Sequence, residues 1–378
     1  MSLMSGRLSR RSALGLAAGL SLLASPRLAE AAPIVVTDVN GRTIPLPRLP
    51  ERIVLGFHFE EFTAVAGPAG WDKVVGFSRA LWAGWRPASF TRYAAVIPRL
   101  ADMPDVGNTE DQTFSLEKVL ALRPDLLILA DWSVKQLGPQ LAQLTALGIP
   151  TVSIDYNAQV PARHAASTRA LGQATGNPAR GEALAQLYTG KVADIERRVR
   201  DVPTHPKVYV ELGQGGAETI GNTYSQTMWA RILDLLRLQN IADGHIAGSW
   251  GPLNPEWVLA ADPAAIFIAG SSWVNRPNAV RTGFDATLAE TRATLAPYAR
   301  RKGWAELTAI RTGQIFAIEH GLCRCLPDYA AMYYIGKQLF PDRFADIAPE
   351  EELRRYYAEW LPVRFSGTWM ARLTPDGA

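Results

Sequence analysis

A segment of fifteen residues occurs twice in this chain, with its two copies 139 positions apart. Residues 116–130 read LEKVLALRPDLLILA, and residues 255–269 read PEWVLAADPAAIFIA. Each copy predicts a short helix that stops before a proline and is followed by a buried strand. Glu117 and Glu256 hold the same place in the two copies. This pattern indicates two similar α/β lobes, each with one acidic docking point, arranged as a clamp around a ligand.

The first 31 residues have the features of a secretory signal peptide. Arg10 and Arg11 precede an uncharged run, 13–24, and Ala29 and Ala31 form a small-residue cleavage site. The run would span roughly 18 Å as a helix, against ~30 Å for a hydrocarbon core, so a membrane anchor is the weaker alternative. We expect cleavage after Ala31 and a periplasmic protein. The arginine pair favours the twin-arginine route.

Charge and cysteine content exclude several classes of protein. The whole chain has 39 basic and 36 acidic residues. The predicted signal peptide carries the whole of this imbalance, in Arg7, Arg10, Arg11, Arg27 and Glu30. The mature chain is therefore formally neutral and shows no basic footprint for nucleic acid. Because its two cysteines, Cys323 and Cys325, are only two residues apart, a disulfide scaffold is excluded, whereas free thiols or a metal-dependent pair stay open.

Strands alternate with helices along the mature chain, which favours parallel sheets with crossover helices. A hairpin is expected around Asn40 and Gly41, because this turn pair tolerates positive φ. The predicted domains are an N-terminal α/β lobe at 32–175, a linking helix at 176–203, and a C-terminal α/β lobe with closing helices at 204–378. The linking helix begins with Pro178 and ends before Pro203. About 25 helical residues would span on the order of 37 Å, enough to cross from one lobe to the other.

Aromatic and arginine side chains gather in the segments expected to follow the strands. In open parallel sheets, ligands bind outside the carboxyl ends of the strands. Indole rings offer apolar area with a hydrogen-bond donor, and guanidinium groups can fork onto anionic oxygens. Together they suit a bulky, partly aromatic, anionic ligand. The candidate ligand-binding residues are His58, Arg79, Trp82, Trp85, Arg86, Trp132, Tyr224, Trp250, Trp273, Arg276, His320 and Arg324.

Signals for metal binding and catalysis are weaker. His320, Cys323 and Cys325 could be metal ligands, but one short loop seldom supplies a complete coordination shell. His58 could donate to a bound chelate. The glycine-rich stretch 213–218 has Glu218 where a dinucleotide-binding fingerprint needs its third glycine. We find neither a Walker phosphate loop nor a Gly-x-Ser-x-Gly elbow, so the sequence favours a binding protein over an enzyme.

From about residue 36 to the C-terminus, the chain resembles the periplasmic binding proteins of ABC importers for ferric siderophores, haem and cobalamin. The resemblance rests on the motif from Asp38 to Val54, on the two repeat copies and on the long helix. It implies two lobes joined by one long helix, with little hinge motion. It also implies a monomer without an intrinsic cofactor. Glu117 and Glu256 would dock on arginines of an inner-membrane permease, which works together with an ATPase.

The sequence narrows the ligand without naming it. A zinc or manganese carrier would need several converging histidines, which this chain lacks. The arginines favour an iron(III) chelate of the siderophore type over the near-neutral cobalamin, with haem also open. A further alternative is an exported redox enzyme that acts on metal chelates through Cys323 and Cys325.

Overall fold

The computed structural model describes residues 33–374, and the predicted signal peptide lies outside them. The described chain opens with the expected hairpin, formed by β1 (Ile34–Thr37) and β2 (Thr43–Leu46). Gly41 has φ +73°, which confirms the need for a turn residue that tolerates positive φ. Asp38 holds this turn, because its carboxylate accepts hydrogen bonds from the backbone N–H groups of Asn40 and Arg42.

The N-terminal lobe contains a parallel four-stranded sheet in the order β4-β3-β5-β6. Every residue of its central strand β5 is buried, as expected for an apolar run covered on both faces. The strands are β3 (Ile53–Leu55), β4 (Val74–Phe77), β5 (Leu126–Ala130) and β6 (Thr151–Ile154). The helices are α1 (Phe59–Ala66), α2 (Arg79–Trp85), α3 (Pro87–Val96), α4 (Leu116–Ala121) and α5 (Asp131–Ala146).

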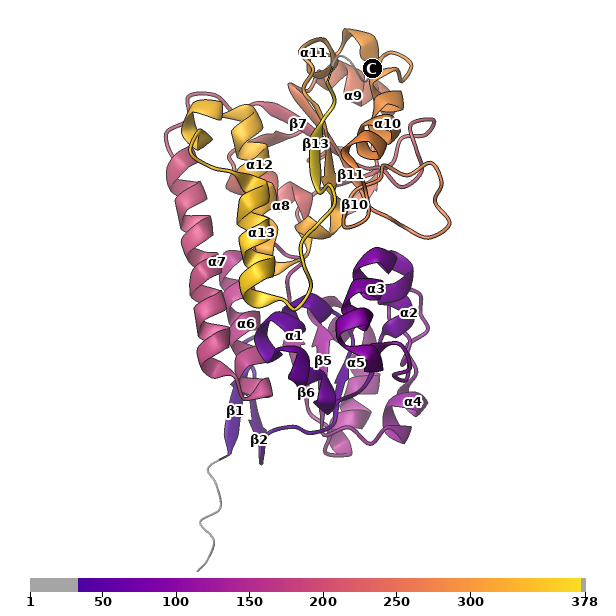
Figure 1. Ribbon diagram of the computed structural model, residues 1–378, viewed down its shortest axis with the longest axis vertical. Coiled ribbons are helices and arrows are strands. Elements are labelled where there is room, and N and C mark those ends of the chain that lie inside the picture. Colours follow the sequence, from indigo (N-terminus) through magenta and orange to yellow (C-terminus); the bar gives the residue numbers. More distant parts are fainter. Residues whose placement is uncertain (1–32, 375–378) are drawn as a thin grey trace, which may run out of the picture. The chain divides into compact units, whose positions relative to one another are not determined.

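Two helices follow the first sheet and pack closely against each other: α6 (Pro161–Thr175) and α7 (Pro178–Val199). A Cβ atom on Gly172 would lie 3.1 Å from the Cα atom of Gly181, so the two backbones meet where neither residue has a side chain. The predicted linking helix is α7, and it ends at Val199, three residues earlier than expected. Figure 1 shows α7 as the longest helix, lying beside α6 and α12.

The C-terminal lobe contains a five-stranded sheet in the order β13-β12-β11-β7-β9. All neighbours in it are parallel except β13, which is antiparallel to β12. Its strands are β7 (Lys207–Leu212), β9 (Gln239–Asn240), β11 (Ala265–Gly270), β12 (Ile315–Glu319) and β13 (Met370–Arg372). A separate antiparallel pair is formed by β8 (Asn222–Tyr224) and β10 (Trp250–Pro252). The helices are α8 (Trp229–Leu235), α9 (Pro255–Ala261), α10 (Leu288–Ala299) and α11 (Thr308–Arg311).

The two closing helices, α12 (Tyr329–Leu339) and α13 (Pro349–Trp360), return the chain to α7 and to the N-terminal lobe. Lys191 on α7 pairs with Glu352 at 2.6 Å, and Arg180 donates to the backbone oxygen of Trp360 at 3.0 Å. One large cluster of buried apolar side chains contains residues of both lobes and of these helices. Within residues 33–374, we find no helix that is both long and apolar enough to cross a membrane. Short 3₁₀ helices cover Pro68–Lys73, Pro98–Leu100, Trp304–Glu306, His320–Cys323, Leu326–Asp328 and Pro341–Phe344.

The repeated segment has the same local structure in both lobes. It forms α4 with β5 in the first lobe and α9 with β11 in the second. Ser115 and Asn254 cap the two helices, each accepting a hydrogen bond from a backbone N–H of the first turn. Glu117 and Glu256 lie exposed in those first turns. The sequence prediction of two α/β lobes with one acidic residue displayed at the same point in each is thus confirmed in geometry.

Candidate functional site

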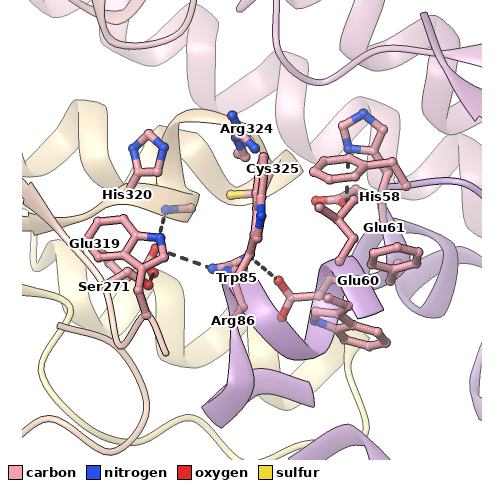
Figure 2. A pocket seen from close by; sticks show the side chains of 16 residues that line it. His58, Glu60, Glu61, Trp85, Arg86, Ser271, Glu319, His320, Arg324 and Cys325 are labelled. Atoms are coloured by element: carbon pink, nitrogen blue, oxygen red, sulfur yellow. Dashed lines mark hydrogen bonds and ion pairs between the residues drawn. The ribbon is translucent and has the colours of Figure 1, made fainter. Parts of the chain in front are cut away.

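Two adjoining cavities lie at the ends of the sheet strands, and four residues line both of them: Trp85, Trp273, His320 and Arg324. The larger cavity has a volume of about 580 Å³ and the smaller one about 50 Å³. Residues from both lobes line each cavity. The smaller cavity is drawn in Figure 2, where Trp85 and Arg86 stand between the groups of the two lobes.

A buried ion-pair cluster forms one wall of the smaller cavity. Arg86, which follows α2, donates to Glu60 Oε2 at 2.6 Å and to Glu319 Oε2 at 3.3 Å. Glu319 ends β12 and also accepts from Ser271 Oγ at 2.9 Å and from the backbone N–H of Gly321. Burial raises the pKa of Glu319, although Arg86 opposes that shift. Two carboxylates therefore neutralise Arg86, and the cluster ties the first lobe to the second.

A second acidic contact joins the lobes beside that cluster. Glu61 Oε1 accepts a hydrogen bond from the backbone N–H of Leu326 at 3.1 Å. Burial raises the pKa of Glu61 to about 7. His58 lies next to it, with Nδ1 at 3.8 Å from Glu61 Oε2 (Figure 2). The His58 ring is fully buried against Phe57, Trp132 and Tyr156, and burial lowers its pKa. Neither ring nitrogen has a hydrogen-bond partner among the residues that the structure describes.

Arg324 is the cation at the junction of the two cavities. Its guanidinium lies over the rings of Phe57 and Trp85, with 5.7 and 5.3 Å to the ring centroids. The Nε atom is buried and has no hydrogen-bond partner within residues 33–374, and Nη2 lies 3.9 Å from the sulfur of Met228. Arg324 forms no ion pair with any carboxylate in the described part of the chain. Its charge is thus held by aromatic faces and is available to a ligand.

His320 is the second polar group that both cavities share. Its Nδ1 atom accepts a hydrogen bond from Trp229 Nε1 at 3.4 Å, and the hydroxyl of Tyr224 lies 3.5 Å from the same atom. Because an indole N–H can only donate, Nδ1 carries no proton and Nε2 carries it in the neutral ring. Burial lowers the pKa of His320, so the ring is neutral near pH 7.

The two cysteines are buried and free. Cys323 donates its S–H to the backbone oxygen of His320 at 3.1 Å. Burial raises the pKa of both thiols, which disfavours the thiolate that a metal ligand or a redox nucleophile needs. Among the described residues, no group of three or more His, Cys, Asp and Glu side chains is arranged to hold a metal ion.

Aromatic rings form much of the wall of the larger cavity, in Trp85, Trp132, Tyr224, Trp250 and Trp273. Trp250 is 56% exposed, so its ring stands largely free at the rim. Two of the four carboxylates of the wall, those of Asp131 and Asp155, form ion pairs. Arg163 holds Asp131 at 3.0 Å and Asp155 at 2.8 Å, and Lys135 also pairs with Asp131 at 2.7 Å. Glu110 and Asp111 lie exposed at the rim.

Ten of the twelve candidate residues line one or both cavities, and Arg79 and Arg276 line neither. Arg79 donates to the backbone oxygen of Ala101 at 2.8 Å, and Arg276 is exposed in the loop after β11. Position after a strand does not fix the direction of a side chain, so these two arginines do not join the other ten at the cavities. Whether any of the twelve contacts a ligand stays a prediction.

Several candidates do not lie in loops as expected. Arg79, Trp82 and Trp85 belong to α2, Trp132 belongs to α5, and Tyr224 and Trp250 belong to the β8–β10 pair. Trp82 is also a packing residue. It is 3% exposed, stacks on Phe59 at 4.9 Å between centroids, and donates to Ser89 Oγ at 3.3 Å.

The sequence interpretation did not include the acidic residues of the smaller cavity, Glu60, Glu61 and Glu319. The first two look like ordinary acids in the first turn of a helix. Glu319 could have been recognised from the sequence, because it is an acidic residue at the end of a strand whose other residues, 315–318, are all apolar.

The chain belongs to the periplasmic binding protein family, whose sequence profile matches residues 69–320. A solved structure of the TroA-like periplasmic binding protein FepB from Veillonella parvula is 33% identical and has a TM-score of 0.85, covering 90% of this chain and all of that one. The uncharacterised ABC transporter substrate-binding lipoprotein YvrC of Bacillus subtilis is 21% identical over 84% of this chain and 88% of its own length. The vitamin B12-binding protein of Pectobacterium atrosepticum is 28% identical, but the match covers 43% of this chain and 56% of that protein.

Proposed function

We propose that this periplasmic binding protein delivers an iron(III) chelate of the siderophore type to an ABC permease and its ATPase, and that the larger cavity holds the chelate. The observation that carries the proposal is an aromatic wall beside the guanidinium of Arg324, which forms no ion pair with a carboxylate among residues 33–374. A volume of about 580 Å³ lies within the usual range for sites of small organic molecules. The rings can cover the apolar and aromatic parts of a chelator while Arg324 meets an anionic oxygen.

A tetrapyrrole, haem or a corrinoid such as cobalamin, is the second candidate. Two arginines that were expected to face the ligand are not free to do so, which favours a ligand of lower charge. Arg86 is neutralised by Glu60 and Glu319, and Arg276 lines neither cavity. A wall of indole rings beside the guanidinium of Arg324 also fits a large ring system of low charge. The vitamin B12-binding relatives agree with this alternative.

A redox enzyme is the third alternative, and the geometry disfavours it. Cys323 and Cys325 are buried, and their thiol pKa values are raised. A thiol–disulfide or reductase cycle needs an accessible thiolate. Incubating the protein with iron chelates and a reductant, and measuring the release of iron(II), would test for turnover directly.

Glu117 and Glu256 are proposed to contact the permease. Both are exposed in the first turn of their helices, and neither forms an ion pair within the described residues. The residues three positions further on, Leu120 and Leu259, are 36% and 39% exposed. Each lobe thus displays a carboxylate beside an apolar side chain, a combination that suits a partner with a basic residue next to an apolar patch.

Titration of tryptophan fluorescence tests the ligand assignment. Purified mature protein would be titrated with ferric citrate, a ferric tris-hydroxamate, a ferric tris-catecholate, haem and cobalamin. The siderophore proposal expects strong quenching by one ferric chelate, because a coloured complex would lie beside several indoles. Saturable binding of haem or cobalamin alone would replace it with the second candidate. A native mass spectrum of protein purified from iron-limited cells would show the mass of the natural ligand independently.

A further inference from the structure

We infer that Arg52 and Lys207 are positioning residues for docking on the permease, because each holds the C-terminal end of a helix whose first turn carries a proposed docking glutamate. These helices are α4, with Glu117, and α9, with Glu256. The inference rests on the proposed docking role of the glutamates and adds the residues that set the direction of their helices. Both cations lie outside the repeated segment of the sequence, so the repeat alone does not point to them.

Arg52 and Lys207 occupy the same place in the two lobes. The residue after Arg52 pairs in parallel with Leu126 of β5, and the residue after Lys207 pairs in parallel with Ala265 of β11. Leu126 and Ala265 are 139 positions apart, like the two copies of the repeat. The two cations therefore stand at equivalent points of two equivalent strand pairs.

The two cations also donate to equivalent backbone oxygens at the ends of the helices. Arg52 Nη2 donates to the oxygen of Leu122 at 2.7 Å, and its Nε donates to that of Arg123 at 3.0 Å. Lys207 Nζ donates to the oxygen of Ala261 at 3.0 Å, and Leu122 and Ala261 hold the same place in the two copies. Carbonyl groups of the last helical turn lack partners inside the helix, and a cation there opposes the negative end of the helix dipole.

Both helices end in a way that makes an external donor important. The next residue in each copy, Arg123 or Asp262, has φ +45°, and a proline follows it. A left-handed residue ends a helix, and proline has no N–H to donate to the open carbonyl groups. With six and seven residues, α4 and α9 span roughly 9–11 Å, which is less than two full turns. Helices this short are unstable alone, so their direction depends on contacts at their ends.

The residues that follow the docking glutamates complete the attachment. Lys118 Nζ donates to the backbone oxygen of Asp105 at 3.3 Å, and Trp257 Nε1 donates to that of Ile241 at 2.7 Å. Lys118 and Trp257 also hold the same place in the two copies. Each helix is thus tied to its own lobe near the glutamate and at its C-terminal end. Loss of the C-terminal tie should let the helix tilt and carry the glutamate with it.

Amide hydrogen exchange on the full mature protein tests the capping directly. Arg52→Met should speed exchange in 116–123 and leave 255–262 unchanged, and Lys207→Met should do the reverse. Arg52→Lys and Lys207→Arg should keep most of the protection, because a cation remains within reach of the helix end.

Two matched controls come from arginines of the same lobes that donate to backbone oxygens elsewhere. Arg79 donates to Ala101 at 2.8 Å in the first lobe, and Arg292 donates to Arg372 at 3.2 Å in the second. Arg79→Met and Arg292→Met should leave exchange in α4 and α9 as it is in the wild type.

Binding to membranes measures the consequence for docking. Labelled mature protein would be titrated, without added ligand, onto membrane vesicles from iron-limited producing cells. Arg52→Met and Lys207→Met should each weaken binding roughly 2- to 5-fold, the range for a cation at a helix C-terminus, and the double variant by roughly the product. In a Glu117→Gln background, Arg52→Met should weaken binding no further, because it acts through that carboxylate. A role in overall stability alone would weaken binding equally in both backgrounds.

The inference is overturned if Arg52→Met and Lys207→Met leave exchange in α4 and α9 unchanged. It is also overturned if both variants bind the vesicles as tightly as Arg79→Met and Arg292→Met, while Glu117→Gln weakens binding. Wild-type binding by a variant with both Glu117→Gln and Glu256→Gln would instead refute the proposed docking itself, and the positioning role would fall with it.

Discussion

Replacing Arg86 by Met should strongly destabilise the protein, because it removes the cation between two buried carboxylates. Arg86 lies 2.6 Å from Glu60 and 3.3 Å from Glu319, whose side chains are 11% and 3% exposed. Methionine retains an unbranched apolar chain, so the main change is the loss of charge. Removing one partner of a buried pair typically costs about 3–5 kcal/mol, since the remaining charge stays buried and unpaired. That is a large part of a typical total stability of roughly 5–15 kcal/mol.

The cost should depend on pH in a defined direction. Burial already raises the pKa of Glu319, and the loss of Arg86 would raise it further. A carboxyl group whose pKa is higher in the folded than in the unfolded state favours folding below its unfolded pKa, and that contribution is lost as pH rises through the folded pKa. The gap in unfolding free energy between wild type and Arg86→Met should therefore be smaller at pH 5 than at pH 8.

Urea unfolding, followed by tryptophan fluorescence at both pH values, measures this gap. Arg92→Met is the matched control, because Arg92 also pairs across the lobes, with Asp285 at 2.7 Å, but the two side chains are 36% and 60% exposed. An exposed pair should cost at most about 1 kcal/mol. Adding Glu319→Gln to Arg86→Met should restore part of the loss. The reasoning is wrong if Arg86→Met costs no more than Arg92→Met, or if its cost is the same at both pH values.

Three further changes have definite expected outcomes. Burial raises the pKa of Glu61 to about 7, so its contribution to the unfolding free energy, up to about 3 kcal/mol, is lost as pH rises from 4.5 to 7. Glu61→Gln should therefore make the unfolding free energy fall less over this range. Urea titrations at several pH values measure the fall, and an unchanged slope in the variant would show that Glu61 is not responsible. Reversing Glu117 and Glu256 to Lys should abolish uptake in cells while ligand affinity and stability stay within about 0.5 kcal/mol of wild type; normal uptake by this double variant would rule out docking at these positions. Replacing Arg10 and Arg11 by lysines should leave precursor in the cytoplasm, as seen by fractionation, and unchanged export would rule out the twin-arginine route.

Local patterns in the sequence were enough to predict most of the regular elements. The apolar runs at 126–130 and 265–269 gave β5 and β11, because a strand covered on both faces needs no polar alternation. The long alanine- and leucine-rich segment after Pro178 gave α7. By contrast, β8, β10 and β13 have three residues each and exist only through pairing with distant partners, so no local pattern marked them.

The lining of the cavities was predicted in part, and its pattern of charge was not. Trp85, Trp132, Tyr224, Trp250 and Trp273 line the larger cavity because strand ends meet at one edge of a sheet, and their contact with a ligand stays a prediction. Arg86 was counted as a cation facing the ligand, whereas its partners Glu60 and Glu319 lie 26 and 233 positions away. Pairing of this kind is a property of tertiary structure, and it decides whether a guanidinium serves a ligand or neutralises a neighbour. Arg324 and Arg86 are indistinguishable in sequence, and only the carboxylates around them separate their roles.

The repeat also places the cavity rim and the proposed docking points close together along the chain. In the first lobe, Asp111 lies at the rim and Glu117 follows six positions later; in the second, Trp250 lies at the rim and Glu256 follows six positions later. Both connecting segments are restrained: the backbone N–H groups of Thr113 and Phe114 donate to Asn108, and β10 pairs with β8. A small displacement at either rim should therefore reach the neighbouring helix, α4 or α9, that carries the proposed docking residue. Ligand occupancy could then be reported to a permease at two points without a large rotation between lobes, a rotation that the buried Arg86 cluster and the closing helices on α7 would oppose.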